Sequence, residues 1–445
     1  MNASRPLWRH RLARALAAAF LCGPWRHAEL VARGAACLGE KPPWLPIAAR
    51  WTRHAFPSPP ASIEPVVERL LRLPSFQLAT TGRPPTPKWR KAFLYVPPDP
   101  VARFAVPPLP SDGALARWLA IPEPLLAWLA DVRGLNRRTA EARLHNYHPR
   151  WLPKAHGGVR LLEEPKPLLK QAQRRILAGL LAHLPPHAAA QAFCSGRSVH
   201  SHAALHAGQA VVIRIDLADF FGSIGRARVR ALFEAAGYPR PVARSLAGLC
   251  TTATPPLVVA RLPRPVDAAE VPYAASQRRH LLAPHLPQGA PTSPAIANLC
   301  AWELDVRLTA LATTFGARYS RYADDLTFSG GPEVARRAGH LVELAMFAAY
   351  ACGFAVRHGK TRVVRSGARQ VVTGLVVNER PHVARAERDQ LKAILHNCVR
   401  HGPAGQNREN HPDFRAHLLG RLGWVAAGDP RHGAKLRALF DRIAW

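Results

Sequence analysis

The sequence predicts an α+β fold, with helices toward both ends of the chain and a small antiparallel sheet between them. Apolar residues recur at helical spacing in Ile63–Leu71 and again in Leu391–Cys398. The segments 211–217, 317–328 and 370–378 are short and rich in β-branched and aromatic residues, which is typical of strands. The last two segments are each divided by a tight turn, and this predicts hairpins.

Length and charge limit the function classes. A chain of 445 residues is long enough for two or three domains. It holds 61 Lys and Arg against 29 Asp and Glu, a formal net charge of +32, which predicts a polyanionic partner and favours nucleic acid over a membrane. No segment of the sequence reaches the length of a membrane span. The cysteines are scattered without any Cys-x-x-Cys pair, so we expect neither a zinc ribbon nor a disulfide framework, and a reducing, cytoplasmic location.

Residues 1–110 form the first predicted domain, a helical extension with proline-rich connectors. The connectors at 56–60 and 83–110 contain several prolines and have no clear periodicity. A further helical stretch is expected from Asp112 to Asn146.

A glycine-tipped hairpin is predicted at residues 154–160, with Lys154 and Arg160 on its two arms. Glycines let backbone amides approach an anion closely, and Lys and Arg supply positive charge. The pattern favours a phosphate site, although glycine hairpins with flanking bases are common. A helix with a basic face is expected to follow at 168–184.

Three aspartates stand where carboxylates are costly. Asp216 ends an apolar strand that begins at Val211, and a buried acid there must be solvated, paired or bound to metal. Asp324 and Asp325 occupy the turn of the hairpin at 317–328, where adjacent carboxylates repel each other. A divalent cation relieves that repulsion, and two such ions can clamp a phosphoryl transfer. A solvated Asp–Asp turn, and an Asp216 that only caps the next helix, are the alternative interpretations.

A bend at Gln288-Gly289 separates these acids in the sequence and leads into a helix. Ser293 is predicted to be its N-cap and Pro294 its first helical residue. A bend directly before a helix N-terminus can line a site for a base or a phosphate.

Beyond the Asp–Asp hairpin we expect a helix at 342–349, a strand pair at 353–364 and a second strand pair at 370–378. Two amphipathic helices should close the chain, and the first carries Arg388 and Lys392 on its polar side. Basic helices of this kind suit contact with a duplex backbone, and an ordinary solvated face is the competing interpretation.

Taken in order, these motifs resemble those of the reverse transcriptase family. The matching segments are the 154–160 hairpin, the Asp216–Phe221 strand end, Gln288–Pro294, Tyr322–Asp325 and Lys360. The resemblance covers about residue 111 to the C-terminus. It implies a right-hand polymerase with fingers and an antiparallel palm sheet in 111–380 and a helical thumb in 381–445. The helical extension at 1–110 lies outside the resemblance.

Within that family the chain is most similar to bacterial retron reverse transcriptases. Val372-Thr373-Gly374 stands where those enzymes have a Val-Thr-Gly signature, and Phe193–Val199 resembles the segment that follows their first motifs. The segment His202–His206 resembles their Asn-Ala-x-x-His element, but His202 replaces the Asn. This departure puts in doubt whichever contact the Asn makes.

The resemblance implies roles for individual residues. The catalytic metal ligands would be Asp216, Asp324 and Asp325, with the carbonyl of Leu217 completing one coordination shell. The implied cofactor is a pair of Mg²⁺ ions, for which Mn²⁺ can substitute. The nucleotide-binding residues would be Lys154, Arg160, Phe221, Gln288 and Lys360, with the ring of Phe221 excluding a 2′ hydroxyl. The RNA-binding residues would be His206, Thr373, Gly374, Arg388 and Lys392.

The implied function is RNA-directed synthesis of single-stranded DNA from deoxynucleoside triphosphates. A structured noncoding RNA would serve as primer and template, a branched RNA-linked DNA and an RNA–DNA hybrid would be the products, and an effector protein would act with the enzyme in anti-phage defence. Residues 1–110 would dock the RNA or the effector. A group II intron-like or other bacterial reverse transcriptase is one alternative. An inactive RNA-binding scaffold is the other, and the presence of all three acids and the Gln-Gly bend disfavours it.

Overall fold

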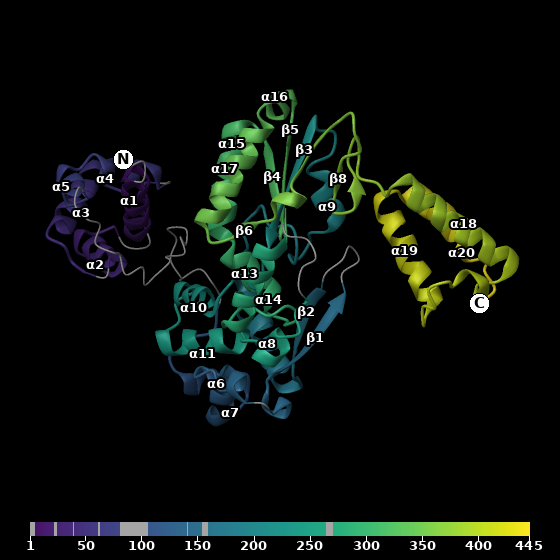
Figure 1. Cartoon of the computed structure of the whole chain (residues 1–445), viewed down its shortest axis with the longest axis horizontal. Coiled ribbons are helices and arrows are strands. Elements are labelled where there is room, and N and C mark those ends of the chain that lie inside the picture. Colours follow the sequence, from purple (N-terminus) through teal and green to yellow (C-terminus); the bar gives the residue numbers. More distant parts are fainter. Residues whose placement is uncertain are drawn as a thin grey trace. The chain divides into compact units, whose positions relative to one another are not determined.

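The computed structural model describes residues 5–21, 25–38, 40–60, 63–80, 106–139, 141–153, 159–263 and 270–445 (Figure 1). The chain forms two compact units, and each unit is assembled from two separate stretches of sequence. The first contains Met1–Pro185 and Phe221–Glu303, and the second contains Pro186–Phe220 and Leu304–Trp445. The domains predicted at 1–110, 111–380 and 381–445 follow sequence order, whereas these units interleave.

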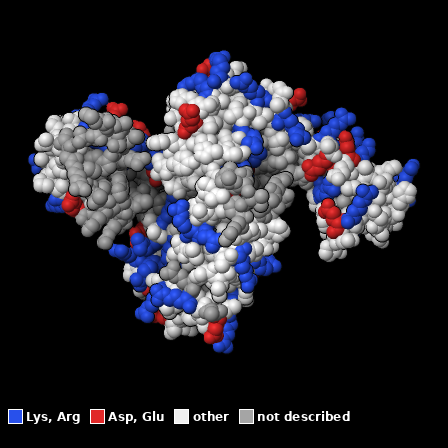
Figure 2. Space-filling view, in the orientation of Figure 1, with Lys and Arg blue, Asp and Glu red and all other residues white. Residues whose placement is uncertain are grey.

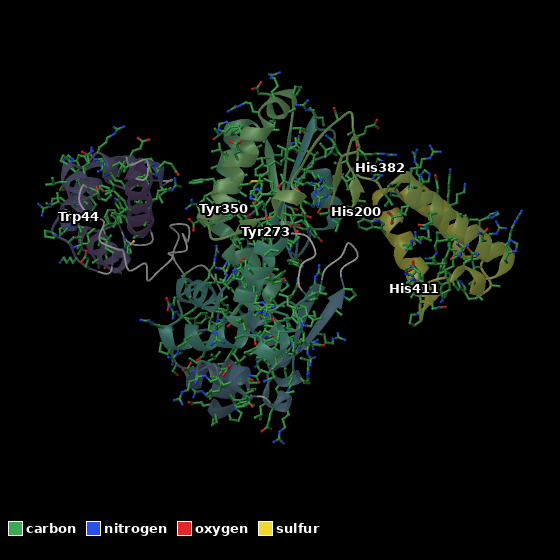
Figure 3. The ribbon with its side chains drawn as sticks, in the orientation of Figure 1. Trp44, His200, Tyr273, Tyr350, His382 and His411 are labelled. Atoms are coloured by element: carbon green, nitrogen blue, oxygen red, sulfur yellow. The ribbon has the colours of Figure 1, made fainter. Side chains whose placement is uncertain are left out.

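The N-terminal helical extension is a bundle with its own core. Its helices are α1 (Arg5–Leu21), α2 (His27–Leu38), α3 (Trp44–Ala55), α4 (Glu64–Leu71) and α5 (Pro74–Ala79). Apolar residues from the first four helices pack together, among them Leu16, Leu30, Leu45 and Leu70. Trp44, labelled in Figure 3, packs edge-on against Phe76 of α5, with ring centroids 5.4 Å apart. The proline-rich connector at 81–105 lies outside the described residues.

The rest of the first unit is mostly helical. Its helices are α6 (Asp112–Leu119), α7 (Glu123–Ala130), α8 (Pro167–Gly179), α10 (Arg226–Ala235), α11 (Arg240–Cys250), α12 (Pro256–Val259), α13 (Val271–Leu282) and α14 (Ser293–Cys300). Helix α8 ends earlier than predicted, at Gly179. The N-cap position of α14 is Thr292, so the predicted cap at Ser293 is displaced by one residue.

An antiparallel pair, β1 (Tyr147–Pro153) and β2 (Val159–Pro165), flanks the segment of the predicted glycine hairpin. Arg160 faces Leu152 across this pair. Lys154 and the glycines of the tip lie outside the described residues.

An antiparallel sheet forms the centre of the second unit. Its strands are β3 (Val211–Ala218), β4 (Arg318–Tyr322), β5 (Asp325–Gly330), β6 (Ala355–Val356) and β7 (Arg362–Arg365). The order is β4-β5-β3-β6, and β7 also pairs with β3. Leu217 faces Val356 and Ile213 faces Val363, so β6 and β7 follow one another along the same edge of β3. The prediction that residues 353–364 pair with each other is therefore wrong.

Helices cover this sheet and extend beyond it. They are α9 (Val199–Ala204), α15 (Trp302–Phe315), α16 (Pro332–Arg336), α17 (Ala338–Ala351), α18 (Arg385–His401), α19 (Phe414–Gly428) and α20 (Pro430–Phe440). Helix α17 contacts β3 and β6 and is longer than the predicted segment 342–349. No helix in the described ranges is long and apolar enough to cross a membrane.

The second predicted strand pair is present as β8 (Val371–Val372) and β9 (Leu375–Val376). It turns at Thr373-Gly374, where both residues have positive φ, 46° and 88°. Val372 and Leu375 share a buried core with apolar residues of the C-terminal helices, including Leu391 and Leu418. This core ties the hairpin to the helices that follow it.

The packing of α11 against α7 generates a stability prediction. A Cβ on Gly248 would lie 2.1 Å from the carbonyl oxygen of Ala130, which is backbone and cannot swing aside. Gly248→Ala should therefore lower the free energy of unfolding by about 1–3 kcal/mol or more. Gly420→Ala is the control, because a Cβ there meets nothing within 4 Å. In the middle of α19 this alanine should stabilise the protein by about 0.5–1 kcal/mol. Urea unfolding of both variants checks the pair, and equal stability for them would contradict the packing.

Candidate active site

The pairing of β3 with β5 brings the three predicted acids together. Asp216 lies directly opposite Asp325 in the antiparallel register. The backbone N–H of Leu217 donates to the carbonyl oxygen of Asp324 at 2.9 Å. Segments more than a hundred residues apart in the chain therefore meet at one end of this sheet, and all three carboxylates belong to the second unit.

Ala323 and Asp324 form the turn between β4 and β5. Tyr322 faces Asp325 across the turn, so only two residues connect the strands. Ala323 has φ of 56°, a left-handed conformation that costs a residue with a side chain about 1–2 kcal/mol. A two-residue turn of this kind matches the twist of the flanking strands, and it holds Asp324 at the tip.

Basic side chains contact two of the acids. The Arg214 guanidinium donates to both carboxylate oxygens of Asp325, at 3.1 and 3.2 Å. Lys360 Nζ lies 3.3 Å from Asp216 Oδ1, and Arg357 Nε lies 3.9 Å from Asp216 Oδ2. Lys360, predicted from its place after the Asp–Asp hairpin, is thus beside the acids.

The carboxylates of Asp324 and Asp325 both have raised pKa values. Desolvation, followed by repulsion from Asp216 and Asp325, raises the pKa of Asp324 to about 6, although the residue keeps contact with solvent. Desolvation also raises the pKa of Asp325, against the opposing effect of Arg214. Both shifts mean that the ionised forms of Asp324 and Asp325 are unfavourable in the folded chain. A positive ion beside the two carboxylates would make their ionised forms more favourable.

The three carboxylates suit a divalent cation by their chemistry, and the register of β3 with β5 brings them close together. Carboxylate oxygens are the ligands that Mg²⁺ prefers, and repulsion among Asp216, Asp324 and Asp325 is what such a cation relieves. The side chains are not gathered around one point: across the described ranges, no three His, Cys, Asp or Glu side chains form a preassembled metal cluster. Asp216 and Asp325 are instead directed to their Lys and Arg partners, so a metal has to displace these contacts.

The histidines of the 202–206 segment lie inside the protein. His206 is fully buried, and its ring nitrogens contact the hydroxyls of Ser320 and Ser329 at 2.6 and 2.8 Å. His202 contacts the Ser320 hydroxyl at 2.8 Å, and its ring stacks on Tyr322 with centroids 5.4 Å apart. Burial lowers the pKa of His202 to about 4 and that of His206 to about 3, so both rings are neutral. The predicted contact between His206 and RNA is wrong for this reason: its side chain has no exposed surface.

The bend before α14 is fixed within the first unit. The N–H of Glu163 donates to the Gln288 carbonyl at 2.7 Å. Gly289 has φ of 121°, and a Cβ there would lie 3.1 Å from the Glu163 carbonyl oxygen, so only glycine fits. The Glu163 carboxylate is itself buried and contacts His285 and Thr254, at 2.9 and 2.7 Å. The bend therefore presents Gln288 from a rigid support.

The two phenylalanines after β3 differ in burial. Phe220 is 3% exposed and packs near Phe354, with centroids 5.5 Å apart. Phe221 is half-buried. Phe220 is thus the core residue, and Phe221 is the more exposed of the two.

The remaining predicted RNA-binding residues lie in the C-terminal part of the second unit. Gly374 and Lys392 are exposed, and Thr373 is half-buried. The Arg388 side chain is 20% exposed and lies 4.0 Å from Asp429 Oδ2, so part of it remains accessible.

Sequence reasoning missed the residues that hold the acids in place. Arg214 and Arg357 lie within the predicted segments 211–217 and 353–364 but were given no role there. Arg321 is the largest fully buried side chain among the described residues. Asp305 is its buried partner. The available signal for Asp305 was an acid on the apolar face of a helix, between Leu304 and Leu308. The signal for Arg214 was a lone base in the apolar strand Val211–Ala218.

The raised pKa of Asp324 predicts an effect of pH on stability. The folded chain holds this proton more tightly than the unfolded chain, so the carboxyl lowers the free energy of unfolding as pH rises from 3.8 to about 6. His202 and His206 act in the opposite sense as pH rises toward 6.5, because folding favours their neutral forms. The difference between Asp324→Asn and the wild type isolates the carboxyl.

We expect Asp324→Asn to gain stability relative to the wild type across that window. Urea unfolding in the presence of a chelator checks the trend. A difference between the two proteins that does not vary with pH would contradict it.

Comparisons with known proteins identify the family of this chain. The family described as reverse transcriptase (RNA-dependent DNA polymerase) matches residues 152–392. Retron Mx65 reverse transcriptase of Myxococcus xanthus is 39% identical over 344 residues, which cover 74% of this chain and 74% of that protein. Retron Mx162 reverse transcriptase of the same organism is 37% identical and covers 75% and 67% of the two chains. Retron Ec86 reverse transcriptase of Escherichia coli is 26% identical and covers 64% and 77%. The chain therefore belongs to the reverse transcriptase family, as a bacterial retron-type reverse transcriptase and RNA-directed DNA polymerase.

Proposed function

We propose that Asp216, Asp324 and Asp325 carry nucleotidyl transfer in this enzyme by holding two divalent cations, with the Leu217 carbonyl as a further ligand. Membership of the family implies dependence on a divalent metal, and we assign Mg²⁺, with Mn²⁺ as a substitute. When bound, the cations activate the 3′ hydroxyl and neutralise the pyrophosphate that leaves. The observation that carries the proposal is the β3–β5 register, which sets Asp216 opposite Asp325.

The basic residues around the acids have complementary tasks. Arg214 orients the Asp325 carboxylate through two hydrogen bonds. Lys360, whose side chain is 57% exposed, is free to turn from Asp216 toward the departing pyrophosphate and donate to it. Arg357, whose Nε lies 3.9 Å from Asp216 Oδ2, offsets part of the negative charge of Asp216.

We assign the incoming deoxynucleotide to Lys154, Arg160, Gln288 and Phe221. The side chains of Lys154 and Arg160 would bind the triphosphate, since Arg supplies a fork of donors and Lys a point charge. The rigid Gln288 bend would contact the nucleotide, and the half-buried Phe221 ring would exclude a 2′ hydroxyl. The exposure of Phe221 relative to Phe220 supports this division of roles.

The template and primer would be a structured noncoding RNA, and the product a branched RNA-linked DNA. The net charge of +32 supports a large polyanionic partner, and Figure 2 shows Lys and Arg outnumbering Asp and Glu on the face it presents. RNA is recognised through its shape, phosphates and 2′ hydroxyls, which suits an extended surface including Thr373, Gly374, Arg388 and Lys392. His206 is omitted from this surface because it is buried.

The enzyme would act in the cytoplasm with an effector protein in anti-phage defence. We propose that residues 1–110 dock the RNA or this effector, 111–380 form fingers and palm, and 381–445 form the thumb. The separate core of the N-terminal bundle supports an independent task for it.

Asp324→Asn tests the catalytic assignment. It keeps the size of the side chain but removes the charge that holds a cation, so we expect primer extension with Mg²⁺ to fall roughly a thousandfold or more. Binding of the RNA should stay near the wild-type affinity, measured by filter binding. Asp441→Asn is the control, because this exposed acid at the end of α20 pairs with the surface residue Arg437. Wild-type synthesis by Asp324→Asn would refute the assignment.

Lys392→Gln tests the RNA surface. The variant should weaken RNA binding and reduce the slope of log affinity against log salt concentration by about 1, since one phosphate contact is lost. Lys435→Gln, on the exposed side of α20, is the charge-matched control. Identical salt slopes for Lys392→Gln and the wild type would remove Lys392 from the surface.

A further inference from the structure

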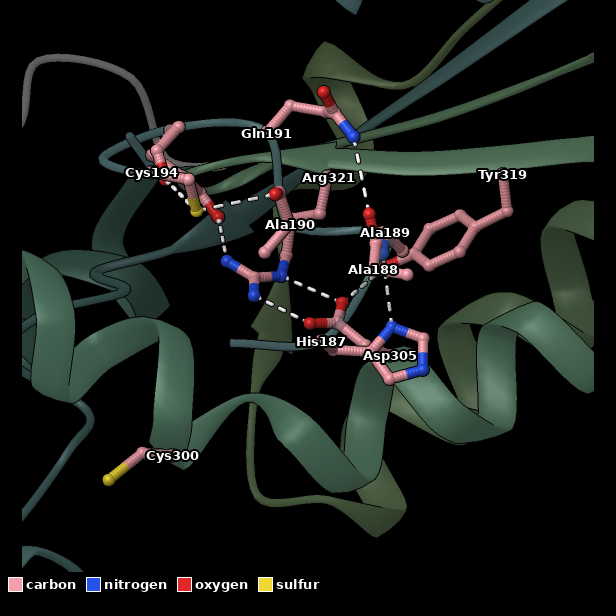
Figure 4. Close-up of polar contacts among 12 residues, drawn as sticks. His187, Ala188, Ala189, Ala190, Gln191, Cys194, Cys300, Asp305, Tyr319 and Arg321 are labelled. Atoms are coloured by element: carbon pink, nitrogen blue, oxygen red, sulfur yellow. Dashed lines mark hydrogen bonds and ion pairs between the residues drawn. The ribbon is translucent and has the colours of Figure 1, made fainter. Parts of the chain in front are cut away.

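The Asp–Asp turn rests on a buried ion pair. Arg321 precedes the turn in β4, and Asp305 lies on α15; both side chains are 0% exposed. The guanidinium donates from Nε to Asp305 Oδ1 at 2.8 Å and from Nη2 to Asp305 Oδ2 at 2.6 Å (Figure 4). The hydroxyl of Tyr319 also donates to Asp305, at 2.9 Å. Asp305 thereby fixes the plane of the guanidinium.

The third nitrogen of the same group reaches the turn. Arg321 Nη1 donates to the carbonyl oxygen of Ala323 at 3.1 Å. That carbonyl belongs to the peptide bond between Ala323 and Asp324. The next peptide bond, between Asp324 and Asp325, is held by the N–H of Leu217 at 2.9 Å. Both peptide planes that flank Asp324 are therefore fixed, one by a buried charged group and one by β3.

The backbone of Arg321 is held as well. Its N–H donates to the Ala189 carbonyl at 2.8 Å, and its carbonyl accepts the N–H of Gln191 at 2.7 Å. The guanidinium also lies over the Phe220 ring, 5.6 Å from its centroid. These contacts leave the side chain little freedom to move away from Ala323.

Energetics favour a positioning role for this pair over a purely stabilising one. Two buried charges lose their hydration, and a pair of apolar residues of similar volume often gives equal or greater stability. The left-handed Ala323 adds strain that a donor on its carbonyl can hold in place. Oriented hydrogen bonds fix the direction of a peptide plane, which apolar packing does not do.

We infer that Arg321, held by Asp305, is a positioning residue that sets Asp324 and Asp325 in the geometry required for metal binding. The inference rests on the proposed role of those two acids as ligands. Arg321 itself touches neither substrate nor metal. Its loss should raise the Mg²⁺ concentration required for synthesis and lower kcat, with little effect on the affinity for RNA.

Two variants separate the charge pair from the turn contact. The double variant Arg321→Met with Asp305→Leu replaces both charges by apolar side chains, so the fold is expected to persist, but Ala323 loses its donor. Arg321→Lys keeps a charge beside Asp305, yet one ammonium group cannot reproduce the fork that serves Asp305 and Ala323 together. Leu308→Val, at a fully buried position on α15, is the control for lost stability alone.

The experiment uses the full chain in primer extension on an annealed RNA template with Mg²⁺ titration. Template affinity and melting temperature are measured in parallel. For both Arg321 variants we expect kcat to fall about tenfold to a hundredfold and the half-saturating Mg²⁺ concentration to rise several-fold, because small misplacements of ligands have effects of this size. Template affinity should stay within about twofold of the wild type, and Leu308→Val should leave the Mg²⁺ requirement unchanged.

A folded double variant with wild-type kcat and Mg²⁺ requirement would overturn the inference. If the double variant does not fold, the same result for Arg321→Lys would overturn it. An increase in Mg²⁺ requirement that Leu308→Val reproduces at equal melting temperature would also overturn it, since stability alone would then explain the effect. Asp324→Asn distinguishes the metal assignment from the positioning role. If Asp324→Asn is inactive and the double variant is fully active, only the positioning role is refuted. If Asp324→Asn is active, the metal assignment and the positioning role are both refuted.

Discussion

The antiparallel pairing of β3 with β5 is the interaction on which the proposed active site depends. It places Asp216 opposite Asp325, and the neighbouring N–H of Leu217 holds Asp324 through its carbonyl. Side chains alternate along a strand, so a slip of one residue would turn Asp216 to the other face of the sheet. The apolar residues of β3 from Val211 to Leu217, nearly all buried, make that slip costly. The hydrophobic core of the sheet thus fixes the position of the charged groups at its end.

Placing three carboxylates together works against stability. The pKa of Asp324 rises to about 6 because its charged form is disfavoured there. Arg214, Lys360 and Arg357 offset part of this cost by contacting Asp325 and Asp216. Such strain at functional sites is maintained only when the surrounding structure holds it. Under the proposed metal assignment, a cation would have to displace these contacts with Arg214, Lys360 and Arg357.

The sequence allowed the strands, the hairpin turn and the three acids to be predicted, because these depend on local composition and on ordered motifs. Partners distant in the chain were harder to predict. The sequence predicted a strand pair at residues 353–364, but local composition carries no information on pairing, and both short strands found there pair with β3. His206 was assigned to RNA because its motif marks a family element, whereas its burial depends on Ser320 and Ser329. The pairing of Arg321 with Asp305 could not be predicted from the sequence, because it depends on how α15 packs against β4.

Strand β4 explains why these hidden residues matter together. Tyr319 and Arg321 contact Asp305 from one face of the strand, while Ser320 and Tyr322 contact His202 from the other. Polar side chains therefore contact both faces of the strand that leads into the Asp–Asp turn, through hydrogen bonds of defined direction. Neutral imidazoles suit the second face, because a charge there would stand unpaired beside buried hydroxyls. A hairpin held only by apolar side chains could shift by a few tenths of an ångström at little cost, and its two carboxylates would shift with it. Directional contacts on both faces oppose that shift, so the polar interior of this sheet supports the geometry of the proposed active site as well as the packing.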